Sequence, residues 1–268
     1  YRPLLIRSGE QEGLSVINPL MVNKVRFSAG GFEAKYTDKM ASVLDIEYRK
    51  PQKWEGDISA SLLGASGYMG WGNKKMSISQ SLRYKTNSYM LGALETDAEY
   101  SPNFVDYQVF MSWMPTKDWS VDVIGYISHN NYKFTPATRE TSFGTMENIH
   151  NFKVYFDGWE QDVFQTFYGT ARVKRTIKDK HYISLNYTAF STRERETYDI
   201  QGQYWLSNTS TATELAVGTY MEHARNRLNS SQHSIKLAYD YRNKGHHIEA
   251  GLGFRHERIA ENSREWEY

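Results

Sequence analysis

The densest group of potential metal ligands lies near the end of the 268-residue sequence, where His246 and His247 are followed by His256 and Glu257. A helical zinc site needs ligands four residues apart, as in H-E-x-x-H, and the sequence does not contain this pattern. In a strand, His246 and His247 would point to opposite faces. The sequence also has no cysteine, which excludes disulfides and cysteine-based zinc sites. We therefore expect exposed turn histidines, no bound metal and no cofactor.

Residue types that could perform catalysis occur without the surroundings that catalysis needs. Glu194 and Glu196 have a spacing compatible with a glycosidase acid and base, but charged residues flank them and no apolar stretch is present to raise a carboxyl pKa. No G-x-S-x-G nucleophile elbow is present. Gly30 and Gly31 are not followed by a P-loop lysine, and a turn with positive φ explains the pair better. We expect that the protein is not an enzyme.

Basic residues cluster once, between Arg172 and Lys180. The whole chain has 32 Lys and Arg against 31 Asp and Glu, a net charge of +1, so it has no general basic field. The cluster spans a predicted strand end and a hairpin turn, where charges are ordinary surface residues. We therefore expect no binding to nucleic acid.

Aromatic and charged side chains in the long predicted connections are the best candidates for contact with a ligand or partner. Trp159, Tyr204 and Trp205 could act as anchors, because large rigid aromatic side chains bury area at low entropic cost. Arg139 and Asp157 would then fix the orientation of a small ligand. The alternative is that these residues pack the connections against one another, as in compact surface loops.

Strands must position these residues, because apolar side chains recur with a period of two through most of the chain. Val105, Tyr107, Val109, Met111 and Trp113 alternate with polar neighbours, and residues 119–134 repeat the pattern after a turn at 115–118. Similar hairpins recur at 165–189 and 235–254, and residues 58–85 add three further strands. The pattern predicts nine strands.

The predicted turns are short at one end of the strands, whereas the connections at the other end are long, at residues 91–103, 134–163 and 193–231. Outer-membrane barrels typically show this asymmetry. They also have strands of about ten residues and aromatic residues near the strand ends, as predicted here. A mean hydropathy of −0.67 without any run of 18 apolar residues excludes a helical span. The polar face carries more charges than a dry sandwich core could hold, which favours a hydrated lumen or the solvent face of an open sheet: Arg83, Lys85, Arg172, Lys174, Lys236, Glu249 and Arg255.

The first fifty residues break the hairpin pattern. They read Ile17-Asn18-Pro19, an alternating stretch at Val22 to Phe27, a glycine-containing turn at Ser28 to Tyr36, and an apolar stretch at Met40 to Ile46. This order resembles the end of the plug domain of TonB-dependent outer-membrane receptors, in the form found in Bacteroidetes, with a linker at Arg49-Lys50-Pro51. The resemblance continues through motifs further along the chain, at residues 83–87, 139–141, 155–158 and 199–205.

The resemblance implies an all-β protein: residues 1–52 as the C-terminal part of a plug domain, and residues 53–268 as the N-terminal part of a large antiparallel transmembrane β-barrel with long extracellular loops. Nine strands are fewer than the 22 of such transporters, and the front lacks a signal peptide, a TonB box and a complete plug, so we expect a piece of a longer protein. Gly30, Gly31 and Phe32 would lie at the plug apex and contact ligand.

The function implied by the resemblance is import of a scarce nutrient, such as an iron chelate, cofactor, glycan or peptide, across the outer membrane. The partners implied are outer-membrane lipid, an unknown small ligand, a surface lipoprotein and the TonB complex, which would act through parts of the protein outside this sequence. The alternative is an accessory or structural barrel without transport, docked to surface lipoproteins or secretion machinery. A soluble secreted binding module is a third reading.

Overall fold

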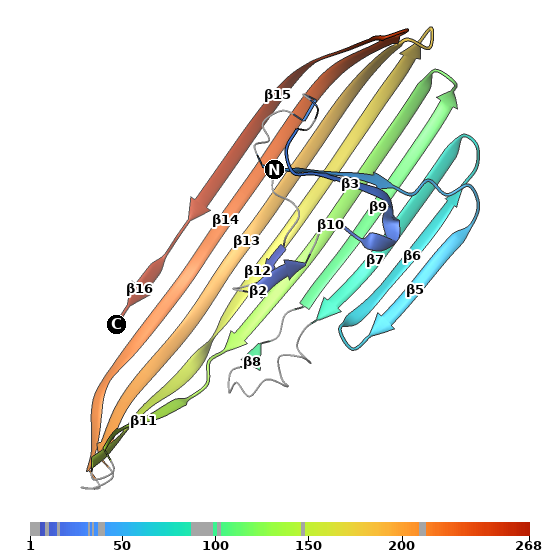
Figure 1. The fold of residues 1–268 in the computed structure, drawn as a ribbon. Helices are drawn as coiled ribbons and strands as arrows, with labels where there is room; N and C mark the ends of the chain where they lie inside the picture. Colours follow the sequence, from blue (N-terminus) through green and yellow to red (C-terminus); the bar gives the residue numbers. More distant parts are fainter. Residues whose placement is uncertain are drawn as a thin grey trace.

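The computed structural model describes residues 6–8, 11–14, 17–31, 33, 35–36, 41–86, 99–100, 103–145, 148–208 and 213–268. These residues form an all-β structure, dominated by one large antiparallel sheet (Figure 1). The one helical element among the described residues is a single 3₁₀ turn, η1 (Pro19–Met21). The all-β class expected from the two-residue period is therefore confirmed.

The main path through the large sheet has nine strands, which is the number that the alternation predicts. Each strand pairs with its neighbours in an antiparallel ladder, and the path ends at β5 and β15, which do not pair with each other among the described residues. In order, the strands are β5 (Glu55–Ser61), β6 (Gly64–Gly72), β7 (Met76–Thr86), β9 (Asn103–Thr116), β10 (Trp119–Thr135), β12 (Asn148–Ile177), β13 (His181–Asn208), β14 (Thr213–Asn243) and β15 (His246–Asn262).

Three short strands pair at the margins of this path. They are β8 (Glu99–Tyr100) beside β10, β11 (Arg139–Thr145) beside β12, and β16 (Glu265–Glu267) beside β14. They add to the sheet without changing the order of the nine long strands.

Four tight turns lie at one end of the sheet, at the upper right in Figure 1. They connect β6 to β7, β9 to β10, β12 to β13 and β14 to β15. Lys178 and Asp179 have φ of 52° and 55°, and Gly245 has φ of 82°, which lets the chain reverse within two or three residues. The turns expected near 73–75, 115–118, 178–179 and 243–245 are confirmed to within two residues.

The connections expected at 134–163 and 193–231 are wrong over most of their length. β12, β13 and β14 have 30, 28 and 31 residues and remain paired through these ranges. The side-chain alternation changes phase there, because apolar residues such as Val154 and Ile200 lie on the concave face and the convex face becomes mostly polar, while the backbone ladder continues. A 30-residue strand spans roughly 100 Å, about three times the hydrocarbon thickness of a bilayer. Of the third expected connection, 91–103, only residues 99–100 and 103 are described.

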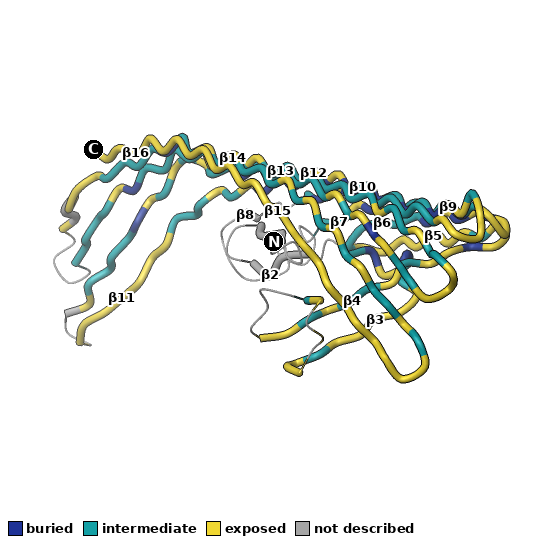
Figure 2. The backbone as a smooth tube through the Cα atoms, turned by 90° about the horizontal axis from the view of Figure 1, so that it is seen from above, coloured by how far each residue is buried: buried dark blue, intermediate teal, exposed yellow. Residues whose placement is uncertain are grey.

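The residues before β5 form two separate hairpins joined by η1. They are β1 (Ile6–Ser8) with β2 (Gln11–Leu14), and β3 (Val22–Ser28) with β4 (Val43–Tyr48). Figure 2 shows the large sheet curved into an arch, with β3 and β4 on its concave side. The main apolar contact between the two parts joins Met21 to Tyr68 of β6 and Phe110 of β9.

Candidate functional site

The large sheet buries polar side chains on its concave face and exposes apolar side chains on its convex face. In β9, Asp106, Gln108 and Ser112 are at most 4% exposed, whereas Val105 and Trp113 are 42% and 45% exposed. A sheet of a water-soluble protein places these residue types the other way round. The register also places all seven charged polar-face residues named in the sequence analysis on the concave face.

The convex apolar side chains line up across the strands. One row runs through Val173, Leu185, Leu237 and Leu252, which are direct cross-strand partners. We call the following exposed set the apolar band: Leu82, Tyr107, Ile127, Phe167, Leu185, Tyr187, Ile235, Leu237, Leu252 and Phe254.

The band ends abruptly along each strand. The convex row that follows it contains His129, Gln165, Arg193 and Asn229, again direct partners across four strands. Beyond this row, residues 148–163 of β12, 193–208 of β13 and 213–231 of β14 form a part that we call the strand extension. On β13 the band therefore covers about ten residues between the turn and the polar row, the length that crosses a bilayer when tilted.

Aromatic side chains border the band next to the tight turns. Trp113 and Trp119 are 45% and 40% exposed there, and the Arg175 guanidinium lies 5.2 Å from the Trp119 ring centroid. His181 contacts the Tyr241 ring at a centroid distance of 5.0 Å. Amphipathic aromatic residues at this level are typical of a membrane interface.

A buried ion pair lies on the concave face, where η1 meets the sheet. Arg83 of β7 binds Asp106 of β9 through two bonds, Nε to Oδ1 at 3.1 Å and Nη2 to Oδ2 at 2.5 Å. Gln108 donates a further bond to Asp106 Oδ2 at 3.2 Å. Arg83 Nη1 also donates to the carbonyl oxygen of Ile17 at 3.4 Å, so that the ion pair joins the sheet to the segment before η1.

The described residues among the first fifty make further polar contacts with the sheet. Ser81 donates to the Met21 sulfur at 3.0 Å, and Lys50 forms an ion pair with Asp122 at 3.1 Å. Lys236 of β14 donates to the carbonyl oxygen of Lys35 at 2.8 Å. The contact is therefore a small apolar cluster surrounded by polar bonds.

The aromatic residues expected to form one ligand surface are not brought together. Tyr204 pairs with Val154, which also pairs with Arg139, and the Tyr204 ring stacks on Phe152 at a centroid distance of 6.1 Å on the concave side. Because successive strand residues alternate faces, Trp205 lies on the convex face.

Trp159 and Asp157 also lie on the convex face, in the same strand extension. Trp159 pairs with Asp199, whereas Trp205 pairs with Lys153, six residues or roughly 20 Å further along β12. Ligand contact by these aromatic residues stays a prediction. Because Tyr204 lies on the concave face and Trp159 and Trp205 on the convex face, one ligand would not contact all three.

Gly30 and Gly31 have φ of 119° and 60°, which confirms that this pair forms a turn of positive φ. Both glycines are exposed, whereas Phe32 lies outside the described residues. The predicted turn histidines are exposed too: His246 faces solvent, and His247 contacts Asp240 at 3.1 Å with half of its side chain accessible.

The sequence analysis missed an acidic group on the concave face of the strand extension. Oxygen atoms of Glu160, Asp162 and Glu196 all lie within 4.8 Å of one another. Burial, followed by the nearby Glu160 and Glu196 carboxylates, raises the pKa of Asp162 to about 7. All three residues fall in ranges that the sequence analysis expected to be connections, and the register of β12 against β13 brings Glu196 beside Asp162.

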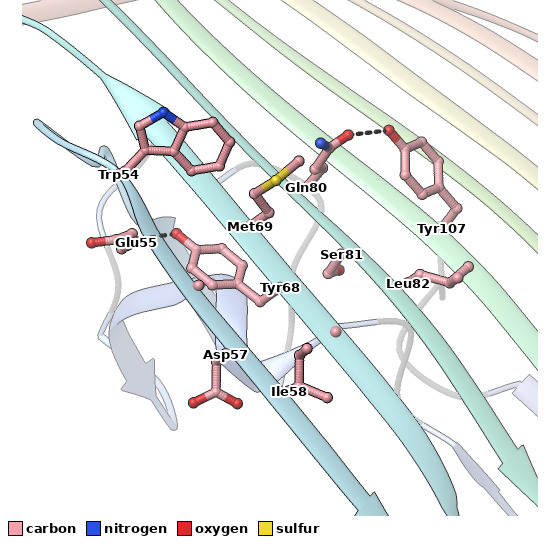
Figure 3. A pocket seen from close by; sticks show the side chains of 12 residues that line it. Trp54, Glu55, Asp57, Ile58, Tyr68, Met69, Gln80, Ser81, Leu82 and Tyr107 are labelled. Atoms are coloured by element: carbon pink, nitrogen blue, oxygen red, sulfur yellow. Dashed lines mark hydrogen bonds between the residues drawn. The ribbon is translucent and has the colours of Figure 1, made fainter.

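An open hollow of about 830 Å³ lies at the β5 edge of the sheet (Figure 3). Apolar side chains from four strands line it: Ile58, Met69, Leu82 and Tyr107. The Tyr107 hydroxyl donates to the side-chain oxygen of Gln80 at 2.8 Å, so this polar group is already paired. The lining suits contact with an apolar chain better than catalysis.

Comparisons with known proteins add no family: no family model, curated protein or solved structure matches the chain. Among the described residues, no helix is long and apolar enough to cross a membrane.

Proposed function

We propose that the chain is part of an outer-membrane importer of the TonB-dependent kind. The large sheet is then a portion of a transmembrane barrel wall, and residues 1–52 are the end of the plug. The imported nutrient is scarce and bound without chemical change, such as an iron chelate, cofactor, glycan or peptide. The observation that carries the proposal is the reversed burial of the sheet, with polar residues inside and the apolar band outside.

Water is an unfavourable medium for the apolar band. Exposed apolar surface costs about 25 cal/mol per Å², and contiguous patches above a few hundred Å² are rare on soluble monomers. Lipid removes this cost, because the convex side chains then contact hydrocarbon. The aromatic border beside the tight turns and the polar row at His129 and Arg193 fit the two interfaces of a bilayer.

The concave contact supports the plug reading. The attached segment combines one small apolar cluster with polar bonds such as Lys50 to Asp122. A plug that is displaced during each import cycle needs a contact of this kind, since a large apolar interface would resist displacement.

The strand extension favours a second candidate, an accessory barrel that docks a surface lipoprotein without transport. Residues 193–208 of β13 reach about 50 Å beyond the band, and charged pairs such as Asp199 with Arg225 lie on their convex face. A partner protein could dock against this surface. The two candidates differ in whether the plug must move.

Uptake by cells that lack the full-length gene separates the candidates. The cells are complemented with the wild type or with a Met21→Cys/Ser81→Cys variant, and the two thiols are joined by a short reducible cross-linker. We expect loss of uptake of one labelled nutrient on cross-linking and recovery on reduction, because Met21 and Ser81 lie on opposite sides of the plug contact. The single-cysteine variants are the controls, and any cysteine elsewhere in the full-length protein is first replaced by serine. Full uptake by the deletion strain, or by the cross-linked variant, would contradict import through this protein.

A further inference from the structure

Three carboxylates meet on the concave face just beyond the apolar band. Asp162 and Glu196 are direct cross-strand partners on β12 and β13, and Glu160 lies two residues further along the same face of β12. Their ligand oxygens lie within 4.8 Å of one another. Like charges placed directly opposite in a sheet repel each other, so this arrangement needs either a bound cation or a proton held between the carboxyls.

Asp162 supplies a separate indication of a missing ligand. Its side chain is buried, with only 6% of the residue exposed, and its Oδ1 atom has no hydrogen-bond partner. An unpaired buried carboxylate oxygen is costly, because it has lost water without gaining a donor. Among the described residues, no Lys or Arg forms an ion pair with Asp162 or Glu196.

Glu196 is held in position by its neighbour on β14. Asn226 Nδ2 donates to Glu196 Oε2 at 2.9 Å, and it also donates to Glu265 Oε1 at 2.5 Å. The Asn226 oxygen accepts bonds from the Arg264 backbone at 3.1 Å and from Ser263 at 2.7 Å. Asn226 is thus a positioning residue that fixes the Glu196 carboxylate toward the group.

We propose that Glu160, Asp162 and Glu196 bind one calcium ion that joins β12 to β13. The donors are all carboxylate oxygens, which suit a hard cation and not zinc or copper. Calcium accepts six to eight oxygens in flexible geometry, with carboxylates bound through one or two oxygens and water completing the shell. Magnesium needs near-ideal octahedral geometry and binds fewer carboxylates, so it fits this group less well. The site does not depend on transport.

The test uses the full-length protein in detergent, treated with EGTA and then titrated with calcium in a calorimeter. We expect one site with a dissociation constant of about 1 mM or tighter, as in extracellular calcium modules. Asp162→Asn keeps the side-chain shape and should weaken binding at least about tenfold. The control is Glu140→Gln, which changes an exposed carboxylate of β11, the strand that pairs with the extension of β12, and which should bind calcium as the wild type does.

Thermal unfolding gives a readout that does not depend on the variants. Calcium should raise the Tm of the EGTA-treated wild type, and the same concentration of magnesium should raise it less. Glu196→Gln serves as a second variant if Asp162→Asn does not fold. The proposal is overturned if the wild type shows neither calcium binding up to about 10 mM nor a calcium-dependent Tm, which would indicate carboxyls kept neutral by protons. Equal calcium affinity of wild type and Asp162→Asn would overturn it as well.

Discussion

Two parts of the same strand, β13, carry different kinds of side chain on the same face. Near the tight turn its convex residues are Ile183, Leu185 and Tyr187, each more than a third exposed. From Arg195 to Gln203 the same face carries only polar residues, among them Thr197, and the strand continues in the same register with β12. The backbone is therefore uniform, and only the side-chain chemistry changes. Under the proposed function, the two parts of the sheet lie in two media, lipid near the turns and water beyond Arg193.

The two parts also use ion pairs differently. Arg83 and Asp106, beside the band, are almost completely buried, whereas Arg225 and Asp199, in the strand extension, are 39% and 25% exposed. A buried pair is costly to break, because one charge is left without water or partner. An ion pair that is exposed to solvent contributes little to the free energy of unfolding.

The largest expected effect comes from removing one partner of the buried pair. Arg83→Met should lower the free energy of unfolding in detergent by about 3–5 kcal/mol, because Asp106 then stays buried without its cation. Arg225→Met should cost about 1 kcal/mol or less, since Asp199 remains partly hydrated. Chemical unfolding of both variants measures this difference. Equal losses would mean that the two pairs share one environment.

A charge within the band should be the next most harmful change. Leu185→Arg should destabilise the assembled protein by about 2–4 kcal/mol, the cost of arginine on the lipid face near the bilayer centre. Gln203→Arg, on the same face and strand in the extension, should have almost no effect, because Gln203 is exposed. Heat-modified migration in SDS gels reports assembly in the outer membrane. If Leu185→Arg assembles as well as Gln203→Arg, Leu185 faces water and not lipid.

The divided aromatic residues sharpen the comparison between faces. If ligand enters from the concave side, Tyr204→Ala should weaken nutrient binding roughly tenfold, which corresponds to about 1.4 kcal/mol. Trp159→Ala, on the convex face, should leave binding unchanged. Binding isotherms of the two full-length variants measure this difference. Weaker binding by Trp159→Ala than by Tyr204→Ala would place the ligand on the convex face.

The smallest effect concerns pH. A hydrogen bond from Arg225, and another from His223, hold the pKa of Asp199 below its ordinary value of 3.8. The ionised form is therefore favoured in the folded state, and its stabilisation is present above about pH 4 and lost as the pH falls below that value. Asp199→Asn should flatten the acid limb of the stability curve by less than about 1 kcal/mol. If the acid limb of the stability curve is unchanged in Asp199→Asn, ionised Asp199 does not contribute to the stability of the fold.

The alternation of side chains was sufficient to predict the part of the large sheet next to the tight turns, and the turns themselves. Val105, Tyr107 and Trp113 alternate with Asp106 and Gln108 because the two faces differ in polarity, and such contrast is visible in sequence. In the strand extension the contrast is reversed, with apolar residues such as Val154 and Ile200 on the concave face, so the period seen nearer the turns is broken although the hydrogen-bonded ladder continues. The prediction therefore ended those strands too early.

The candidate site was less predictable than the fold. The charged residues of the concave face could be assigned from their period, as Arg83 shows. The acidic group could not, because Asp162 and Glu196 meet through a register that pairs residues 34 positions apart. Likewise, Tyr204 and Trp205 were grouped by proximity in sequence, although neighbours in a strand point to opposite sides.

The central claim is that the convex face of one strand passes from lipid into water. The 268 residues contain no cysteine, so, once any cysteine elsewhere in the full-length protein is replaced by serine, single spin labels can be attached at Leu185→Cys and Gln203→Cys in bilayers. Collision rates with oxygen, which concentrates in lipid, and with a water-soluble nickel complex are then compared. The account predicts that oxygen dominates at position 185 and the nickel complex dominates at position 203. Dominance of the nickel complex at both positions would contradict it.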